Sequence, residues 1–344
     1  MPRVSVLLSV HNGETFLPPA LDSLLAQSFE DFEVIAVDDG STDSSGAILD
    51  RRAAEDPRVQ VVHQPNAGLI ASLNRAAHLA SGELIARMDA DDLCEPGRLA
   101  VQVRHMDEHP DVGILGGVAA YVDEASRLTG QTWPRVTSAG INAWRLLFST
   151  CICHPTVMMR RVVLDDLGGY RPSALHAEDY ELWSRAVFAT RIENLPKVVL
   201  RRRLWDGTIG NRHADVQEQT VVTAMASAHR RLLGRPVDRG VVAVLRELHR
   251  SRAADVDLRG HATAGVGRHL ADLAIAFRER FSLTEAEVRA IERDVAAKFR
   301  VLTLQGDRSE LVANLTEILR RDPLIAVRGP LRSFRRRLAP VIGR

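Results

Sequence analysis

Short apolar runs alternate with amphipathic stretches along the first part of the chain. Continuous apolar runs are typical of strands that are buried on both faces of a sheet, and apolar residues spaced three and four apart are typical of helices. The pattern predicts strands at residues 4–10, 32–37, 59–63 and 84–88, with helices between them at 14–27, 44–55 and 69–80. Strands that alternate with helices in this way predict a parallel, doubly wound sheet.

The pattern changes twice further along. Residues 95–205 are less regular, and they predict helices at 96–109 and 141–148, strands at 112–120 and 198–203, and a helix that begins near residue 178. After about residue 213 the strand signals vanish, and a capping box at Ser282–Glu285 predicts the start of a helix that ends near Leu302. We therefore predict an α/β domain over residues 1–212 and an all-helical extension over residues 213–344.

Three carboxylates lie within four residues after the fourth predicted strand. These are Asp89, Asp91 and Asp92. Their mutual repulsion is costly unless solvent or a cation compensates it. Carboxylate oxygens are suitable ligands for Mg²⁺ or Mn²⁺, which in turn bind diphosphates. The cluster therefore predicts a metal–diphosphate site at the mouth of the sheet, and the alternative is an acidic surface loop.

Polar residues also follow the first two predicted strands. Ser9 and the pair His11–Asn12 end the first strand, and Asp38 and Asp39 end the second. Doubly wound sheets bind ligands at the carboxyl ends of their strands, which favours one shared site over a chance acidic loop. The following Gly40 suits a tight turn, but a turn does not account for two adjacent carboxylates. A carboxylate there can accept a hydrogen bond from a nucleobase N–H or a ribose hydroxyl.

Composition narrows the class of protein. The 344 residues carry a formal net charge of +1, so overall charge gives no argument for nucleic acid as a partner. The three cysteines cannot all pair internally and lack a metal-binding spacing, as expected for reduced cytoplasmic thiols. No stretch approaches the about 20 apolar residues that span a bilayer. We therefore expect a cytoplasmic protein.

Several motifs, in a fixed order, resemble those of the family-2 glycosyltransferases, which have the GT-A fold. In this chain they are Val4–Gly13, Asp38–Asp43, Asn66–Leu69 with Asn74, Gly82–Asp92, His154–Thr156 and Glu178–Asp179. The resemblance covers roughly residues 3–205. It implies an inverting, metal-dependent enzyme that moves a sugar from a nucleotide diphosphate-sugar to a hydroxyl acceptor, in the biosynthesis of cell-surface polysaccharide.

The resemblance also implies a nucleotide site and a metal site. Asp39 would accept a hydrogen bond from the nucleobase, usually uracil, with Ser9 near the same base. Asn66 belongs to the same nucleotide-binding set, and Asp89 would approach the ribose or the metal. Asp91 would ligate the Mn²⁺ or Mg²⁺ ion that bridges the diphosphate. One departure is His11, which stands where the family usually has tyrosine or another aromatic residue.

Asp179 is the candidate general base, which would take the proton from the acceptor hydroxyl. Alternatively, Glu178 and Asp179 only stabilise the N-terminus of a helix. His154, Glu178 and Trp183 are candidate contacts with the donor or acceptor. A His-Pro turn such as the one at His154 is also common as a purely structural feature.

Two rival classes stay open from the residues. A sugar-phosphate nucleotidyltransferase would need a basic, glycine-rich loop after the first strand, and the loop at residues 11–14 carries no Lys or Arg. A non-catalytic nucleotide-sugar-binding protein would be expected to lack Asp91 or Asp179, and both are present. A Rossmann dehydrogenase is disfavoured, because no G-x-G-x-x-G follows the first strand.

The expected partners are a donor, preferably a UDP-sugar, and a glycan or lipid-linked acceptor. Arg201–Arg203 and His213 would either cover the diphosphate or be solvated. The basic tail at residues 328–338 is either a solvated helix end or a contact with anionic lipid, which would place the protein at the inner face of the membrane. Acceptor docking, a homodimer and membrane contact all fit the helical patterns of residues 213–344.

Overall fold

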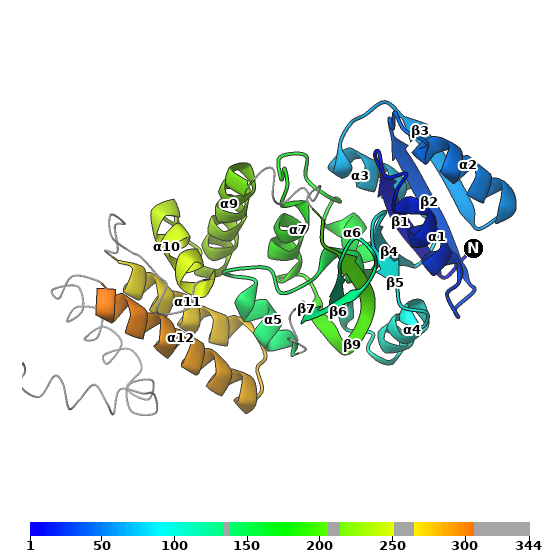
Figure 1. Cartoon of the computed structure of the whole chain (residues 1–344). Coiled ribbons are helices and arrows are strands. Elements are labelled where there is room, and N and C mark those ends of the chain that lie inside the picture. The colour runs from blue at the N-terminus through cyan, green and yellow to red at the C-terminus, as the bar shows by residue number, and fades with distance from the viewer. Residues whose placement is uncertain (134–135, 137, 206–213, 251–264, 306–344) are drawn as a thin grey trace, which may run out of the picture. The chain divides into compact units, whose positions relative to one another are not determined.

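The structure is a computed structural model that describes residues 1–133, 136, 138–205, 214–250 and 265–305 (Figure 1). The chain divides into two compact units. One comprises Met1–Asn142 with Thr150–Val221, and the other comprises Ala143–Ser149 with Val222–Arg344. The domain boundary that the sequence predicts after residue 212 lies outside the described residues, so that division stays a prediction.

The first unit is built on a 9-stranded mixed sheet with the order β3-β2-β1-β4-β8-β6-β9-β5, in which β7 pairs with β6. The strands are Val4–Val10 (β1), Phe32–Asp39 (β2), Val59–Gln64 (β3), Leu84–Asp89 (β4), Leu93–Cys94 (β5), Val112–Val122 (β6), Leu128–Thr132 (β7), Met158–Arg160 (β8) and Arg191–Arg203 (β9). The helices of this unit are Leu17–Leu25 (α1), Ser45–Glu55 (α2), Leu69–Leu79 (α3), Arg98–Glu108 (α4), Arg161–Asp166 (α6) and Glu178–Ala186 (α7), with a 3₁₀ turn at His154–Thr156 (η1). Ala139–Arg145 (α5) and Ala214–Leu233 (α9) each contribute residues to both units.

The predicted alternation of strands and helices is confirmed for β1 to β4, which run parallel. The sheet then becomes mixed, because β8 lies antiparallel to both β4 and β6. The short strands β5, β7 and β8 were not predicted. Because the order 3-2-1-4 reverses direction at β1, the carboxyl ends of β1 and β4 flank the switch point where such sheets bind ligands.

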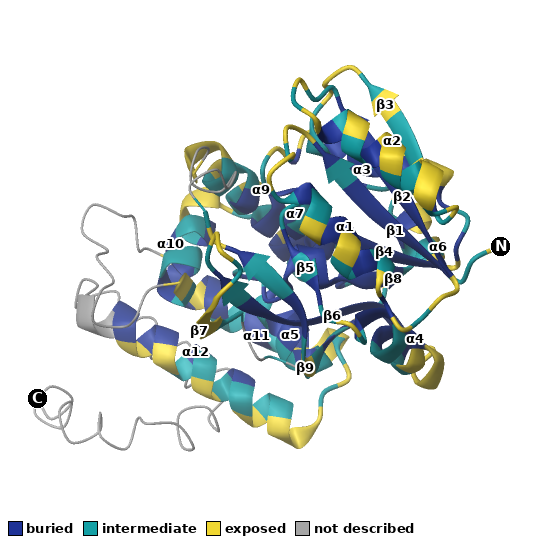
Figure 2. Ribbon diagram, turned by 45° about the vertical axis from the view of Figure 1, so that its right-hand side comes forward, coloured by how far each residue is buried: buried dark blue, intermediate teal, exposed yellow. Residues whose placement is uncertain are grey.

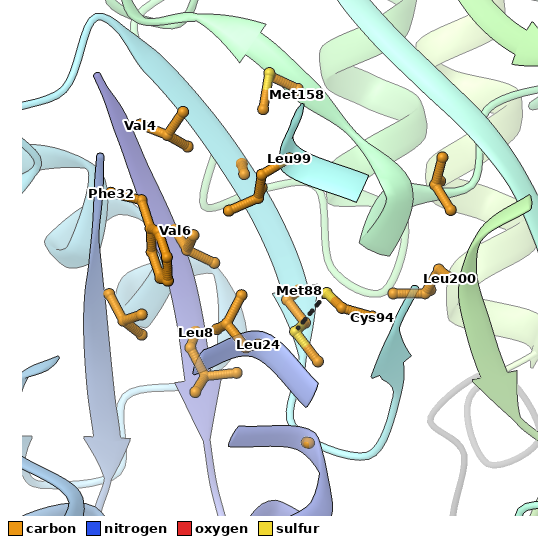
Figure 3. Close-up of a cluster of buried hydrophobic side chains, with 14 of the residues drawn as sticks. Val4, Val6, Leu8, Leu24, Phe32, Met88, Cys94, Leu99, Met158 and Leu200 are labelled. Carbon is orange, nitrogen blue, oxygen red and sulfur yellow. Dashed lines mark hydrogen bonds between the residues drawn. The ribbon is translucent and has the colours of Figure 1, made fainter. Parts of the chain in front are cut away.

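One face of the sheet packs against α1, α2 and α4. Leu24 of α1 and Leu99 of α4 belong to the same buried cluster as Val6 and Leu8 of β1 and Phe32 of β2 (Figure 3). Full burial of one such side chain contributes about 1.5–3 kcal/mol. This packing explains the almost continuous burial of β1, β2 and β4 in Figure 2, and it gives the carboxyl ends of these strands a rigid base.

The intervening strand positions form the other face, against which α3 packs over β1 and β2. Leu7 and Ile35 are fully buried there. Arg87 of β4 is in register with Leu7, so a charged side chain shares this otherwise apolar face. Arg87 lies two residues before Asp89, so both side chains project to this same face.

The second unit is helical, as predicted for the C-terminal region, and it includes Arg239–Arg250 (α10), Val266–Arg280 (α11) and Glu285–Gln305 (α12). Trp144 packs edge-on against Phe148 and Phe277, with ring centroids 5.0 and 5.2 Å apart. None of the helices in the described part of the chain is long and apolar enough to cross a membrane.

The capping box of α12 lies two residues later than the sequence predicted. The Glu287 carboxylate accepts a hydrogen bond from the Thr284 N–H at 2.9 Å, and the Thr284 hydroxyl accepts one from the Glu287 N–H at 3.3 Å. The pattern S-x-x-E at Ser282 overlaps the pattern T-x-x-E at Thr284. The second pattern is the one used, because Thr284 directly precedes the first helical residue.

Candidate active site

Asp39, at the end of β2, organises the loop between β3 and α3. Its carboxylate accepts hydrogen bonds from Gln64 Nε2 at 2.7 Å and from the backbone N–H groups of Ala67 and Gly68, both at 2.8 Å. Burial opposes ionisation of Asp39, but these hydrogen bonds outweigh it and lower its pKa. Asp39 is therefore an ionised acceptor, and the role in base recognition predicted for it stays a prediction.

His11 links the loops after β1, β2 and β3. Its Nδ1 lies 2.9 Å from the Asp39 carbonyl oxygen, so Nδ1 carries the proton and donates it. Its Nε2 then accepts, and Asn66 Nδ2 lies 3.2 Å away. Ser9 is in register with Asp89 of β4. The predicted nucleotide-binding residues Ser9, Asp39 and Asn66 thus lie along one edge of the sheet with Asp89.

Asp38 has different hydrogen-bond partners from the adjacent Asp39. Its Oδ1 accepts a hydrogen bond from the Ser41 N–H at 3.1 Å, and its Oδ2 lies 2.9 Å from His63 Nδ1. Burial opposes ionisation here too, but the contacts with Ser41 and His63 lower the pKa of Asp38. The two adjacent carboxylates therefore stabilise two different loops, which the sequence alone did not distinguish.

The three carboxylates after β4 come together. Oxygen atoms of Asp89, Asp91 and Asp92 all lie within 4.8 Å of one another. Burial and the charge of Asp89 raise the pKa of Asp91. Burial and the charges of Asp89 and Asp91 raise the pKa of Asp92 well above its usual range.

This acidic cluster fits a divalent cation. Asp92 is 1% exposed, and its Oδ2 is buried without a hydrogen-bond partner. Asp91 Oδ2 accepts a hydrogen bond from Trp205 Nε1 at 2.8 Å, and Asp89 is partly exposed. Mg²⁺ and Mn²⁺ prefer hard oxygen ligands, and a cation would give the buried Asp92 Oδ2 and its neighbours the positive charge that this turn lacks. Asp91 and Asp89 are the residues that would hold the ion.

Arg203, at the end of β9, fixes the turn that carries these carboxylates. Its Nε donates to the Asp91 carbonyl oxygen at 2.9 Å, and its backbone N–H donates to Asp92 Oδ1 at 2.9 Å. Its guanidinium also lies 4.4 Å from the ring centroid of Phe16. Arg203 is 2% exposed, so the solvated alternative is wrong for this residue, and the diphosphate contact stays a prediction. His213, named in the same prediction, lies outside the described residues.

Arg87 is the component of the site that the sequence analysis missed. It is 3% exposed, and its Nη1 lies 2.5 Å from Asp89 Oδ2. Its positive charge also acts on Tyr170 and Glu178. The sequence does indicate this contact. Residues two apart on a strand project to the same face, so a buried arginine two residues before Asp89 has a carboxylate as its neighbour.

Glu178 and Asp179 begin α7 and belong to the same electrostatic cluster. Burial and the charge of Asp179 raise the pKa of Glu178 to about 7. Burial raises the pKa of Asp179, while the positive charges of Arg87 and Arg202 oppose the rise. Asp89 and its ion-pair partner Arg87 both act on the pKa values of Glu178 and Asp179, and the roles predicted for these carboxylates stay predictions.

His154 is buried next to Glu178. It is 7% exposed, its Nδ1 is 3.9 Å from Glu178 Oε1, and its Nε2 is 2.9 Å from the Tyr170 hydroxyl. Burial and the charges of Arg87 and Arg202 lower its pKa well below the usual range, so its imidazole is neutral. The ring of Trp183 packs edge-on against His154, with centroids 5.8 Å apart. Trp183 is completely buried, so its predicted contact with a ligand, which stays a prediction, would require it to become exposed.

A mixed, mainly parallel sheet with an acidic cluster after β4 and a pair of adjacent carboxylates at the start of α7 is the arrangement expected of the GT-A class of glycosyltransferase. Residues 5–168 match the family model for glycosyl transferase family 2. The chain is 30% identical over 212 residues to the amylovoran biosynthesis glycosyltransferase AmsE of Erwinia amylovora, a match that covers 60% of this chain and 79% of AmsE. The chain belongs to glycosyl transferase family 2 and is a glycosyltransferase.

A second relative and one solved structure are also similar to this chain. The putative glycosyltransferase EpsE of Bacillus subtilis (strain 168) is 36% identical over 188 residues, which cover 54% of this chain and 66% of EpsE. The crystal structure of S. aureus TarS residues 1–349 with UDP-GlcNAc superposes with a TM-score of 0.60 at 21% identity, covering 91% of this chain and 89% of TarS 1–349. The likeness to TarS shows the fold.

Proposed function

We propose that this glycosyltransferase is inverting and metal-dependent, and that it moves a sugar from a nucleotide diphosphate-sugar to a hydroxyl acceptor in surface polysaccharide biosynthesis. The observation that carries the proposal is the group of Asp89, Asp91 and Asp92 oxygens within 4.8 Å of one another, of which Asp89 also acts on the pKa of Asp179. The UDP-GlcNAc bound by TarS favours a UDP-sugar donor, and the name of AmsE favours a polysaccharide product.

The nucleoside half of the donor would bind along the edge formed by Ser9, Asp39 and Asn66. The ionised Asp39 is a hydrogen-bond acceptor for a base N–H, and its existing bonds to Ala67 and Gly68 fix its orientation. A bound Mn²⁺ or Mg²⁺ would neutralise the charge that grows on the departing nucleoside diphosphate. Asp91 and Asp89 would hold that ion.

Asp179 would act as the general base. A carboxylate with a raised pKa accepts a proton more readily than an ordinary aspartate, and burial raises the pKa of Asp179. Arg87 and Arg202 oppose the rise and so favour the ionised form that a base needs. One base acting on the face opposite the diphosphate gives a single displacement, which inverts the anomeric configuration.

The test compares Asp179→Asn with the wild type and with Asp166→Asn, an exposed aspartate of α6. We expect Asp179→Asn to keep donor affinity but to lose about 100-fold or more in turnover, whereas Asp166→Asn is unchanged. Nucleoside diphosphate release gives the rate, and NMR of the product gives its anomeric configuration. A near-normal rate for Asp179→Asn, or a product with retained configuration, would contradict the proposal.

We also propose a glycan or lipid-linked acceptor. The basic tail at residues 328–338, through which the sequence predicts contact with anionic lipid, lies outside the described residues. Co-sedimentation with anionic liposomes tests that contact by comparing the full chain with a chain that ends at residue 327. Equal pelleting of the two would end the idea of a tail-mediated contact.

A further inference from the structure

Asn74, in the middle of α3, binds the backbone of Tyr170 on both sides. Its Oδ1 accepts a hydrogen bond from the Tyr170 N–H at 2.9 Å, and its Nδ2 donates to the Tyr170 carbonyl oxygen at 2.8 Å. The preceding Gly169 has φ +70, and a Cβ atom there would lie 2.7 Å from Asn74 Oδ1. The contact therefore needs both an amide side chain at residue 74 and the absence of a side chain at residue 169.

The segment bound by Asn74 is also fixed to α7. Arg185 of α7 donates hydrogen bonds to the carbonyl oxygens of Leu167 and Gly169. The Arg185 guanidinium is oriented by Glu181, one turn earlier on the same helix. Displacement of residues 167–170 would therefore displace α7, which begins with Glu178 and Asp179.

A second connection leads from the same segment to the site. The Tyr170 hydroxyl lies 2.9 Å from His154 Nε2, and His154 Nδ1 lies 3.9 Å from Glu178 Oε1. Tyr170 is 1% exposed and His154 is 7% exposed, so neither side chain can shift without repacking the interior. The segment that Asn74 holds at Tyr170 is thus connected to α7 in two ways, through Arg185 and through His154.

The other end of α3 touches the predicted nucleotide edge. Gly68, which caps α3, donates its N–H to Asp39 Oδ2, and Ala67 donates to Asp39 Oδ1. Asn74 lies six positions after Gly68, which along a helix is a rise of about 9 Å. One rigid helix therefore joins the loop that orients Asp39 to the segment that orients α7.

We propose that Asn74 is a positioning residue for sugar transfer, which fixes Asp179 relative to the bound donor through Tyr170, Gly169 and Arg185. Asn74 touches no reacting group in this arrangement and acts only through its neighbours. The inference rests on the proposed function, because it assigns Asp179 as the base. A displacement of about 1 Å in a reacting group can cost about 100-fold in rate.

The first experiment measures Asn74→Ala against Ser81→Ala. Ser81 follows the carboxyl end of α3 and donates its hydroxyl to Glu33 at 2.8 Å, so its variant also loses a hydrogen bond but at the opposite edge of the sheet. We expect Asn74→Ala to lower kcat by about 10-fold to 100-fold, with nucleoside diphosphate affinity changed by less than about twofold. Ser81→Ala should leave both quantities unchanged. Equal kcat values for Asn74→Ala and Ser81→Ala would overturn the proposal.

A double-mutant cycle tests the contact itself. Gly169→Ala alone should lower kcat, because its Cβ would meet Asn74 Oδ1. Combined with Asn74→Ala, the same change should cost less, since the clashing atom is gone. Additive effects on kcat would show that the two residues do not act through this contact.

Hydrogen–deuterium exchange separates the inference from the proposed function. Asn74→Ala should speed amide exchange in residues 167–186 and leave residues 32–39 unchanged. Unchanged exchange in residues 167–186 would overturn the positioning role whatever the activity. If the wild type bound no nucleoside diphosphate, the proposed function would fail, and faster exchange would still establish that Asn74 fixes this segment.

Discussion

In β4, the guanidinium Nη1 of Arg87 lies 2.5 Å from Oδ2 of Asp89, two residues further along the strand. Arg87 is almost completely buried, whereas about a third of the Asp89 side chain is exposed. The same guanidinium charge acts on Glu178 and on Asp179. A single buried cation thus compensates carboxylates that come from β4 and from α7.

Replacement of Arg87 should therefore destabilise the first unit. Arg87→Met keeps a long side chain but removes the charge that is ion-paired with Asp89 and acts on Glu178. Removal of one partner of a buried ion pair costs about 3–5 kcal/mol, and the partial exposure of Asp89 reduces the expected loss in the free energy of unfolding to about 2–3 kcal/mol. Arg87→Lys retains the charge and should lose less. Urea denaturation measures both, and wild-type stability for Arg87→Met would contradict the compensating role.

Gly40 tests the junction between the loops after β2 and β3. Gly40 has φ +69, and a Cβ atom there would lie 2.6 Å from the backbone nitrogen of Asn66. Gly130 has a similar φ of +79, but its Cβ would meet nothing within 4 Å, so Gly130→Ala reports backbone strain alone. Both variants should lose about 1 kcal/mol or more from strain. Gly40→Ala should lose more, and it alone should weaken nucleoside diphosphate binding, as calorimetric titration would show.

Much of this site follows from the sequence because it depends on local order. Ser9 and Asp39 lie at the carboxyl ends of apolar strands and Asp91 follows one, and parallel strands place their carboxyl ends at one edge of a sheet. Contacts between distant segments were not predictable in the same way. The sequence does not show that β8 enters the sheet antiparallel, or that Asn74 binds the backbone of a residue 96 positions later. Such contacts depend on tertiary packing, for which a single sequence carries no periodic signal.

The helical unit should be acid-labile. His229 is fully buried, its Nε2 donates to the Leu147 carbonyl oxygen at 2.7 Å, and its Nδ1 lies 3.1 Å from His269 Nε2. Burial and His269 lower the pKa of His229 to about 3, and burial and Arg235 lower that of His269 to about 4. Below the usual pKa of about 6.5 the unfolded chain binds protons that the folded unit excludes. Stability should therefore fall as pH decreases from about 6.5 towards 4.

The pKa of His63 shifts in the opposite direction, so His63 serves as a control. Hydrogen bonds to Asp38 and Asp50 raise the pKa of His63, so its contribution is present below about pH 6.5 and is lost as pH rises through the raised value. Denaturation curves between pH 4 and 8 for the wild type, His229→Gln and His63→Gln would separate the two effects. His229→Gln should reduce the acid sensitivity, and His63→Gln should not. Equal acid sensitivity in the wild type and His229→Gln would show that the buried pair is not its origin.

The central claim is that Asp91 and its neighbours bind a divalent cation that holds the diphosphate of the donor. The most direct measurement is the thermal-unfolding midpoint with UDP, GDP or dTDP, each with and without Mn²⁺, in the wild type and in Asp91→Ala. Ligands that bind the folded state raise its stability by mass action. We predict that one nucleotide raises the wild-type midpoint only when Mn²⁺ is present, and that Asp91→Ala abolishes this increase. An increase that is independent of Mn²⁺, or that persists in Asp91→Ala, would contradict the account.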